Sequence, residues 1–238
     1  DEAVRLLEDL LRIDPGHAEA LARIGAMRAV DPATARPYLE EAVRLQPRRV
    51  DYLIQLGVCY LRLGDHRRAE ATLRRGLEIA PDDRDLGNNL TVVLTLEARY
   101  AEAETALRGL LEADPLFAEA RNNLALCLLY QGRTAEAEAE VRRALAVAPE
   151  LRDARLTLSE VMFTQRRYRE SARVLTELLA EAPHDHELRA RLGLALEAGG
   201  DPALALPELR AAAPVFPGHL DLALALARAE ERAGDPAA

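Results

Sequence analysis

Apolar residues recur at spacings of three and four along most of the chain, which predicts a series of amphipathic helices. The pattern is clearest in five stretches that each end directly before a proline, at residues 6–14, 72–80, 106–114, 140–148 and 174–182. Proline ends a helix because it has no amide donor and disfavours helical geometry in the residue before it. A second apolar helical pattern follows each proline and is clearest at residues 52–60. The chain is therefore expected to be all-α.

The helix-ending prolines recur with an almost constant period. They are Pro15, Pro47, Pro81, Pro115, Pro149, Pro183 and Pro217, so that one interval of 32 residues is followed by intervals of 34. Between prolines the pattern breaks at glycines such as Gly64, Gly132 and Gly200, where glycine supplies a left-handed cap. Each period thus predicts a helix, a tight turn, a second helix and another turn.

Within each period the same positions carry the same kinds of residue. When the proline is counted as position 32, position 8 is small (Gly25, Gly57, Thr91, Ala125, Ser159, Gly193), position 20 is small (Ala35, Ala69, Ala103, Ala137, Ser171, Ala205) and position 24 is large and apolar (Leu39, Leu73, Leu107, Val141, Leu175, Leu209). Small residues at positions 8 and 20 allow two helices to approach closely. This pattern resembles the tetratricopeptide repeat (TPR) family, in an array of bacterial type.

The resemblance covers the whole chain and implies its architecture. It implies one right-handed superhelical α-solenoid over residues 1–238, of about 14 antiparallel helices, with one continuous core. The expected units are a half repeat at 1–17, full repeats at 18–49, 50–83, 84–117, 118–151, 152–185 and 186–219, and a half repeat at 220–238.

Two of the full repeats are irregular. The unit 18–49 is two residues short, and the loss falls at the turn before Asp31. Pro32 and Pro202 are expected to begin a helix, whereas Pro37 and Pro207 lie about one turn further on and should kink that helix or delay its start. A local bend in the solenoid and a functional hinge both remain open.

Composition excludes several classes of protein. A net charge of −9 argues against a general nucleic-acid binder, and no uncharged apolar run of about 18 residues predicts a membrane span. The chain carries no phosphate-binding loop and no nucleophile or acid–base constellation, which indicates a non-enzyme without cofactor. Cys59 and Cys127 share position 10 two repeats apart, which is too distant for a disulfide, so we expect them to pack as small apolar residues. This favours a cytoplasmic location, with a periplasmic one left open.

Two polar patterns have a structural and a functional interpretation. His184 and His186 have the spacing of two metal ligands, but histidines in turns are common and further ligands are missing, so no metal site is expected. Position 2 is acidic in every unit (Glu19, Asp51, Asp85, Glu119, Asp153, Glu187, Asp221). A carboxylate there stabilises the first turn of a helix; the alternative is an acidic rim that meets a basic partner.

In the TPR family the first helix of each repeat lines a concave groove, which implies the contact residues. They are Gln55, Val58, Arg62, Asn88, Asn89, Val92, Asn122, Asn123, Leu126, Tyr130, Thr157, Phe163 and Arg191. Asn89 and Asn123 at position 6 resemble the asparagine ladder of the O-GlcNAc transferase repeats, which grips an extended peptide backbone. An amide side chain can both donate to and accept from a peptide. A packing role for these asparagines remains the alternative.

These residues suggest a non-catalytic scaffold that binds a peptide or protein segment in its groove. Chaperone-tail capture is not expected, because the family's carboxylate clamp needs lysine and this chain has none. One alternative is a targeting or substrate-recruiting module of a larger enzyme similar to a glycosyltransferase or sulfotransferase. Another is a scaffold that self-assembles into a homo-oligomer by stacking its terminal half repeats.

Overall fold

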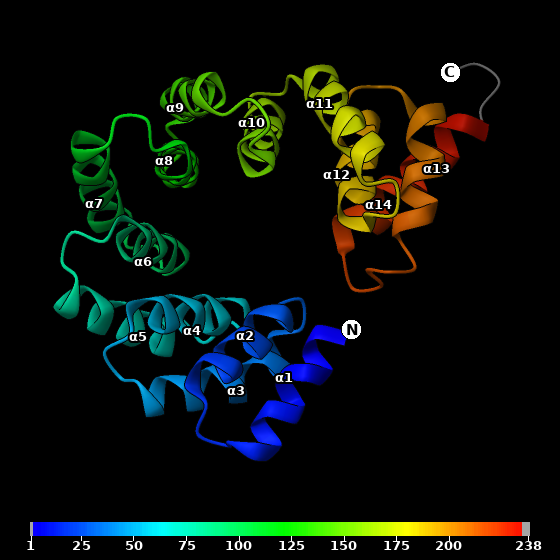
Figure 1. The fold of residues 1–238 in the computed structure, drawn as a ribbon. Helices are drawn as coiled ribbons and strands as arrows, with labels where there is room; N and C mark the ends of the chain where they lie inside the picture. Colours follow the sequence, from blue (N-terminus) through cyan, green and yellow to red (C-terminus); the bar gives the residue numbers. More distant parts are fainter. Residues whose placement is uncertain (1, 235–238) are drawn as a thin grey trace. The chain divides into compact units, whose positions relative to one another are not determined.

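The computed structural model describes residues 2–234 and divides into two compact units, Asp1–Pro115 and Leu116–Ala238. Every regular element in the described residues is an α-helix, 14 in all, which confirms the all-α class (Figure 1). The outer ends of the two predicted half repeats, residue 1 and residues 235–238, lie outside the described residues.

The helices of each unit follow the predicted order. The first unit contains α1 (Glu2–Ile13), α2 (Ala18–Met27), α3 (Pro32–Leu45), α4 (Val50–Arg62), α5 (His66–Ile79), α6 (Arg84–Leu96) and α7 (Tyr100–Ala113). The second unit contains α8 (Ala118–Tyr130), α9 (Thr134–Val147), α10 (Arg152–Thr164), α11 (Tyr168–Glu181), α12 (His186–Ala198), α13 (Pro202–Ala212) and α14 (Leu220–Gly234). The seven prolines that set the period thus each separate two helices.

Capping side chains fix where several of the first helices begin. The carboxylate of Asp83 accepts hydrogen bonds from the amides of Asp85 and Leu86 at the start of α6. Asp185 does the same for α12. His17 and His219 hold the same place in their repeats, and the Nδ1 atom of each accepts from an amide three residues on, at 3.1 and 3.3 Å. Two of the turn histidines are therefore helix caps.

The turn between the two helices of a repeat depends on a left-handed residue at position 15. Gly64, Gly132 and Gly200 have φ values of 73°, 77° and 85° there, as their place in the pattern predicts. Ala98 and Arg166 occupy the same position with φ of 58° and 61°. A side chain with a Cβ atom is strained in this conformation, so two of the turns are less favourable than the other three.

Close contact between the two helices of a repeat rests on the small residues at position 8. A Cβ atom added to Gly57 would lie 2.7 Å from a methyl carbon of Leu73, and one added to Gly193 would lie 2.7 Å from a methyl carbon of Leu209. Leu73 and Leu209 are fully buried. The predicted close approach of the two helices is therefore confirmed, and at position 8 it is made against the large residue at position 24.

The irregular prolines lie inside helices. Pro32 and Pro202 are the first residues of α3 and α13, as expected. Pro37 and Pro207 lie five residues further on, within the same helices, and both are exposed. Of the two expected effects, a delayed helix start is wrong, because Pro32 and Pro202 already provide the fixed φ of a first helical residue. The kink stays a prediction.

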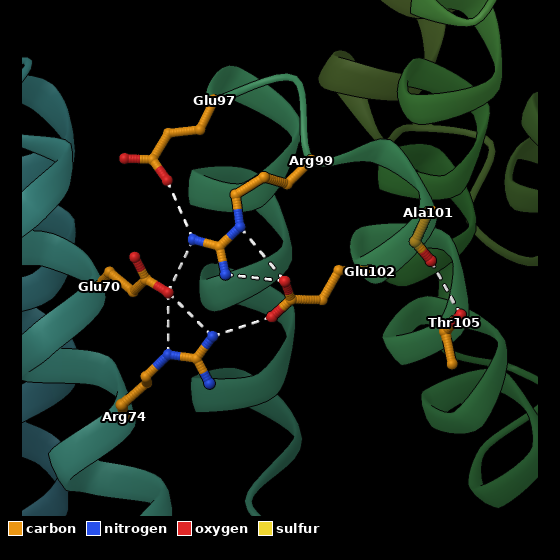
Figure 2. Close-up of polar contacts among 7 residues, drawn as sticks. All are labelled: Glu70, Arg74, Glu97, Arg99, Ala101, Glu102 and Thr105. Atoms are coloured by element: carbon orange, nitrogen blue, oxygen red, sulfur yellow. Dashed lines mark hydrogen bonds and ion pairs between the residues drawn. The ribbon is translucent and has the colours of Figure 1, made fainter.

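An ionic network joins neighbouring repeats in the first unit, and Figure 2 shows its members. The Arg99 guanidinium lies 2.9 Å from Glu70 of the preceding repeat and 2.7 Å from Glu102 of its own repeat. Arg74 also contacts both carboxylates, at 2.8 and 2.9 Å. We call these four residues the first-unit ion network.

The second unit repeats this arrangement at the same repeat positions. Arg167 contacts Glu138 of the preceding repeat at 2.8 Å and Glu170 of its own repeat at 2.7 Å. Arg142 contacts Glu138 at 2.7 Å, and the amide of Gln165 donates to the same carboxylate. We call these five residues the second-unit ion network. Ionic contacts thus supplement the apolar core between repeats in both units.

Candidate peptide-binding surfaces

The residues predicted to contact a ligand divide between the two units. Gln55, Val58 and Arg62 lie on α4, and Asn88, Asn89 and Val92 lie on α6, all in the first unit. The other seven lie on α8, α10 and α12 of the second unit, and they are Asn122, Asn123, Leu126, Tyr130, Thr157, Phe163 and Arg191. All 13 therefore lie on first helices of their repeats.

A pocket of about 220 Å³ opens between α2, α3 and α4 in the first unit. Its walls are mostly apolar and include Gly25, Ala26, Ala29, Pro32, Ala35, Leu39, Ile54, Gln55, Val58, Cys59 and Arg62. Three of the predicted contact residues, Gln55, Val58 and Arg62, are thus brought together at one place. We refer to this feature as the α2–α4 pocket.

Two polar side chains of the α2–α4 pocket have unusual surroundings. The Oε1 atom of Gln55 is buried and accepts no hydrogen bond from any described residue. The exposed guanidinium of Arg62 donates to the carbonyl of Ala29, and it pairs with no carboxylate within residues 2–234. The pocket therefore offers one cation without a counter-ion.

Cys59 lines the same pocket as a thiol. Its Sγ atom lies 3.3 Å from the Pro32 carbonyl, to which it donates. Burial raises the pKa of the Cys59 thiol, which keeps it protonated and suited to that donor role. Cys127 is also a buried thiol, so both cysteines pack as the sequence analysis expects.

The three predicted residues of α6 are half-buried. One N–H of the Asn89 amide donates to the carbonyl of Asp85 at 2.8 Å within its own helix. The hydroxyl of Thr91 donates to the carbonyl of Asn88. This local contact uses one N–H of the Asn89 amide and leaves its oxygen for other contacts.

In the second unit, two predicted contact residues are buried. Asn122 is only 4% exposed, and its Oδ1 atom accepts no hydrogen bond within the described part of the chain. Thr157 is 3% exposed, and its hydroxyl donates to the carbonyl of Asp153 at 2.9 Å. Asn123 and Leu126 are half-buried, whereas Tyr130 and Phe163 are exposed. The sequence period alone did not distinguish these buried positions from the exposed ones.

A second pocket of about 190 Å³ lies between α10, α11 and α12. Phe163 and Arg191 line it together with Ser159, Glu160, Ser171, Leu175 and Leu194. The Arg191 guanidinium lies 3.5 Å from Glu160 and 2.8 Å from Glu187. The Phe163 ring packs edge-on against Tyr168, with centroids 5.2 Å apart. This pocket occupies the same repeat positions as the α2–α4 pocket, but its charges are already paired.

The next two first helices, α12 and α14, are joined by ion pairs from two partly exposed arginines to one buried carboxylate. Glu197 on α12 has a side chain only 6% exposed and lies 3.0 Å from Arg228 and 3.3 Å from Arg232 on α14. A buried carboxylate is stable only when it is paired in this way. The first-helix surface of the second unit is therefore more ionic than the α2–α4 pocket.

Other kinds of site find no support in the part of the chain that the structure describes. Within residues 2–234 no three histidine, cysteine or acidic side chains gather in a geometry that could hold a metal ion. No helix among those residues is long and apolar enough to cross a membrane.

The protein consists of tandem helix pairs that pack through small residues and carry pockets along their first helices. This architecture is that of a helical repeat protein. Two sequence models of the tetratricopeptide repeat match the chain, one over residues 26–90 and 129–194 and the other over residues 97–154. Because the first model alone matches more than half of the chain, this protein belongs to the tetratricopeptide repeat family. A comparison with curated protein sequences gives no match.

Several solved structures share the fold. The Cut9–Hcn1 hetero-tetramer of the APC/C matches with a TM-score of 0.80 at 15% identity, over 96% of this chain and 46% of the other. TTC0263, a thermophilic TPR protein of Thermus thermophilus, matches with a TM-score of 0.69 at 22% identity, over 75% of this chain and 98% of the other. PilW, a type IV pilus biogenesis factor, matches with a TM-score of 0.70 at 21% identity, over 88% of this chain and 98% of the other. This chain thus spans less than half of the Cut9–Hcn1 chain that it matches.

The family and the fold imply a role as a protein-interaction scaffold. The sequence identities to these structures are below 25%, so the likeness shows the fold and does not identify a binding partner. The ligand therefore has to be inferred from the residues of this chain.

Proposed function

We propose that this protein is a non-catalytic scaffold that binds an extended peptide or protein segment on the first-helix surfaces of its repeats. The observation that supports this most directly is the α2–α4 pocket, where three of the predicted contact residues line an apolar pocket open to solvent. Concave apolar sites with a few polar groups are the usual form of a ligand site.

The two asparagines at position 6 support the peptide as ligand. Asn89 and Asn123 are half-buried on α6 and α8, so each retains solvent-accessible atoms. An amide can satisfy both the N–H and the carbonyl of a peptide backbone, which binds an extended segment with little demand on its sequence.

Peptide selection from a random displayed library, followed by titration of one selected peptide for each unit, tests this function. Asn89→Ala in the first unit and Asn123→Ala in the second should each weaken binding of the peptide on its own unit by about threefold to tenfold, because each removes hydrogen bonds worth about 1 kcal/mol. Circular dichroism should show that both variants keep their helix content.

Thr105→Ala and Thr176→Ala are the matched controls. Both threonines are exposed on second helices, and each donates a 2.8 Å hydrogen bond to the carbonyl four residues earlier. Their removal should leave the affinity unchanged. If the asparagine variants bind as tightly as the original chain, or if the threonine variants lose as much affinity as they do, the first helices are not the binding surface.

A further inference from the structure

The repeat 18–49 has the smallest side chains at two positions that the other repeats fill. Position 12 is Ala29, whereas the other full repeats carry Leu61, Thr95, Leu129, Phe163 and Glu197 there. Position 9 is Ala26, whereas the others carry Val58, Val92, Leu126, Glu160 and Leu194. Both alanines line the α2–α4 pocket beside Gly25. The α2–α4 pocket thus has smaller side chains at these two positions than the pocket between α10, α11 and α12, which Glu160 and Phe163 line.

The shortened helix α2 opens the pocket further. It has 10 residues, whereas α4, α6, α8, α10 and α12 have 13 each. The two missing residues of this repeat fall at its turn, so α2 ends at Met27 and Ala29 lies outside it. A cavity of about 150 Å³ accepts a benzene molecule. The α2–α4 pocket of about 220 Å³ is therefore large enough for a leucine or isoleucine side chain.

The polar atoms of the pocket restrict which polar groups a ligand can carry next to its leucine or isoleucine side chain. The Arg62 guanidinium has no carboxylate partner in residues 2–234, and it lines the same pocket. Charge complementarity therefore favours a carboxylate on the ligand.

We propose that the α2–α4 pocket binds a peptide segment in which a branched aliphatic residue stands next to an acidic residue. The aliphatic side chain enters between Gly25, Ala26 and Ala29. The acidic side chain of the segment pairs with Arg62. This inference rests on the proposed peptide-binding function and specifies the ligand for one of its surfaces.

Nuclear magnetic resonance titration of the whole chain with the short peptide acetyl-Gly-Leu-Asp-Gly-amide tests the proposal. A ligand of this size should bind in the millimolar range and shift the amide signals of Gly25, Ala29 and Gln55. Alanine in place of leucine in the peptide should weaken binding about tenfold or more, because the buried aliphatic surface is lost. Asparagine in place of aspartate should weaken it about two- to fivefold, because Arg62 is exposed and screened.

Three substitutions in the protein separate the pocket from its surroundings. Ala29→Leu places in the pocket the residue that two other repeats carry at this position, and it should abolish binding of the probe. Ala71→Leu adds the same atoms at an exposed site on α5, and it should leave binding unchanged. Arg62→Gln should remove the preference for aspartate over asparagine in the peptide. Thermal unfolding checks that each variant folds, and Ala26→Val replaces Ala29→Leu if that variant does not.

Two results would overturn the assignment of the pocket. One is the absence of a saturable shift up to about 10 mM probe, and the other is equal binding of the probe by the original chain and a folded Ala29→Leu variant. The proposed function would then still stand if library-selected peptides bind and depend on Asn89 and Asn123. If no library-selected peptide binds, the proposed peptide-binding function is contradicted, whatever the result for the α2–α4 pocket.

Discussion

The guanidinium of Arg99 lies 2.9 Å from the carboxylate of Glu70, a residue 29 positions earlier in the chain. The same relationship joins Arg167 to Glu138 at 2.8 Å in the second unit. In each case the arginine also forms an ion pair with a glutamate of its own repeat. One arginine side chain therefore links two neighbouring repeats. Because repeat proteins gain stability from contacts between neighbours, these two networks are expected to contribute to the stability of each unit.

Removal of a shared carboxylate tests that contribution. Glu138→Gln should lower the free energy of unfolding by on the order of 1 kcal/mol, because Glu138 accepts from Arg142, Gln165 and Arg167 while mostly shielded from solvent. Urea denaturation followed by circular dichroism measures the change. Glu150→Gln is the control, since Glu150 is exposed and forms no ion pair within the described residues. Equal effects of the two substitutions would contradict a stabilising role for the network.

The same carboxylate should make stability depend on pH. The hydrogen bond from Arg167, with further help from Arg142 and Gln165, lowers the pKa of Glu138 from 4.5 to about 2 despite partial burial. A depressed carboxylate pKa adds stability that is fully present above the unfolded value of 4.5 and is lost as the pH falls towards the folded value.

Thermal unfolding between neutral pH and about pH 2 checks this dependence. The difference in melting temperature between the original chain and Glu138→Gln should be constant above about pH 5 and should shrink as the pH falls. A difference that stays constant down to the lowest pH would show that the ion network does not carry it.

The left-handed residues in the turns between helices should also affect the stability of the protein. Ala98 and Arg166 hold a left-handed conformation that Gly64, Gly132 and Gly200 adopt without strain. Ala98→Gly and Arg166→Gly should each raise the free energy of unfolding by about 0.5–1 kcal/mol, and Gly132→Ala should lower it by about 1 kcal/mol. Urea denaturation again gives the values. Destabilisation by both glycine substitutions would mean that lost side-chain contacts outweigh the relief of strain.

The helices could be predicted from the sequence because each is encoded locally. The period of the prolines and the apolar spacing locate every helix pair, and small residues such as Gly57 identify the face that meets Leu73. These signals depend on neighbours within one repeat, where chain geometry already limits the arrangement.

The pockets and ion networks could not be predicted in the same way. The α2–α4 pocket depends on where α2 ends and on side chains of three helices, although the short repeat and the small residues Ala26 and Ala29 were visible signals. Arg99 and Glu70 both have the pattern of solvated surface residues, and only the stacking of repeats shows that they meet. The burial of Asn122 and Thr157 likewise follows from packing rather than from their repeat position.

Two glycines provide a direct test of how closely the helices pack. At Gly57 an added Cβ atom would lie 2.7 Å from Leu73, whereas at Gly109 on α7 it would meet nothing within 4 Å. Gly57→Ala should therefore destabilise the protein by about 1–3 kcal/mol, because overpacking outweighs the gain in helix propensity. Gly109→Ala should stabilise it by about 0.5–1 kcal/mol through helix propensity alone. Urea denaturation measures both changes, and a stabilising Gly57→Ala substitution would show that Leu73 can move aside and that the contact is not tight.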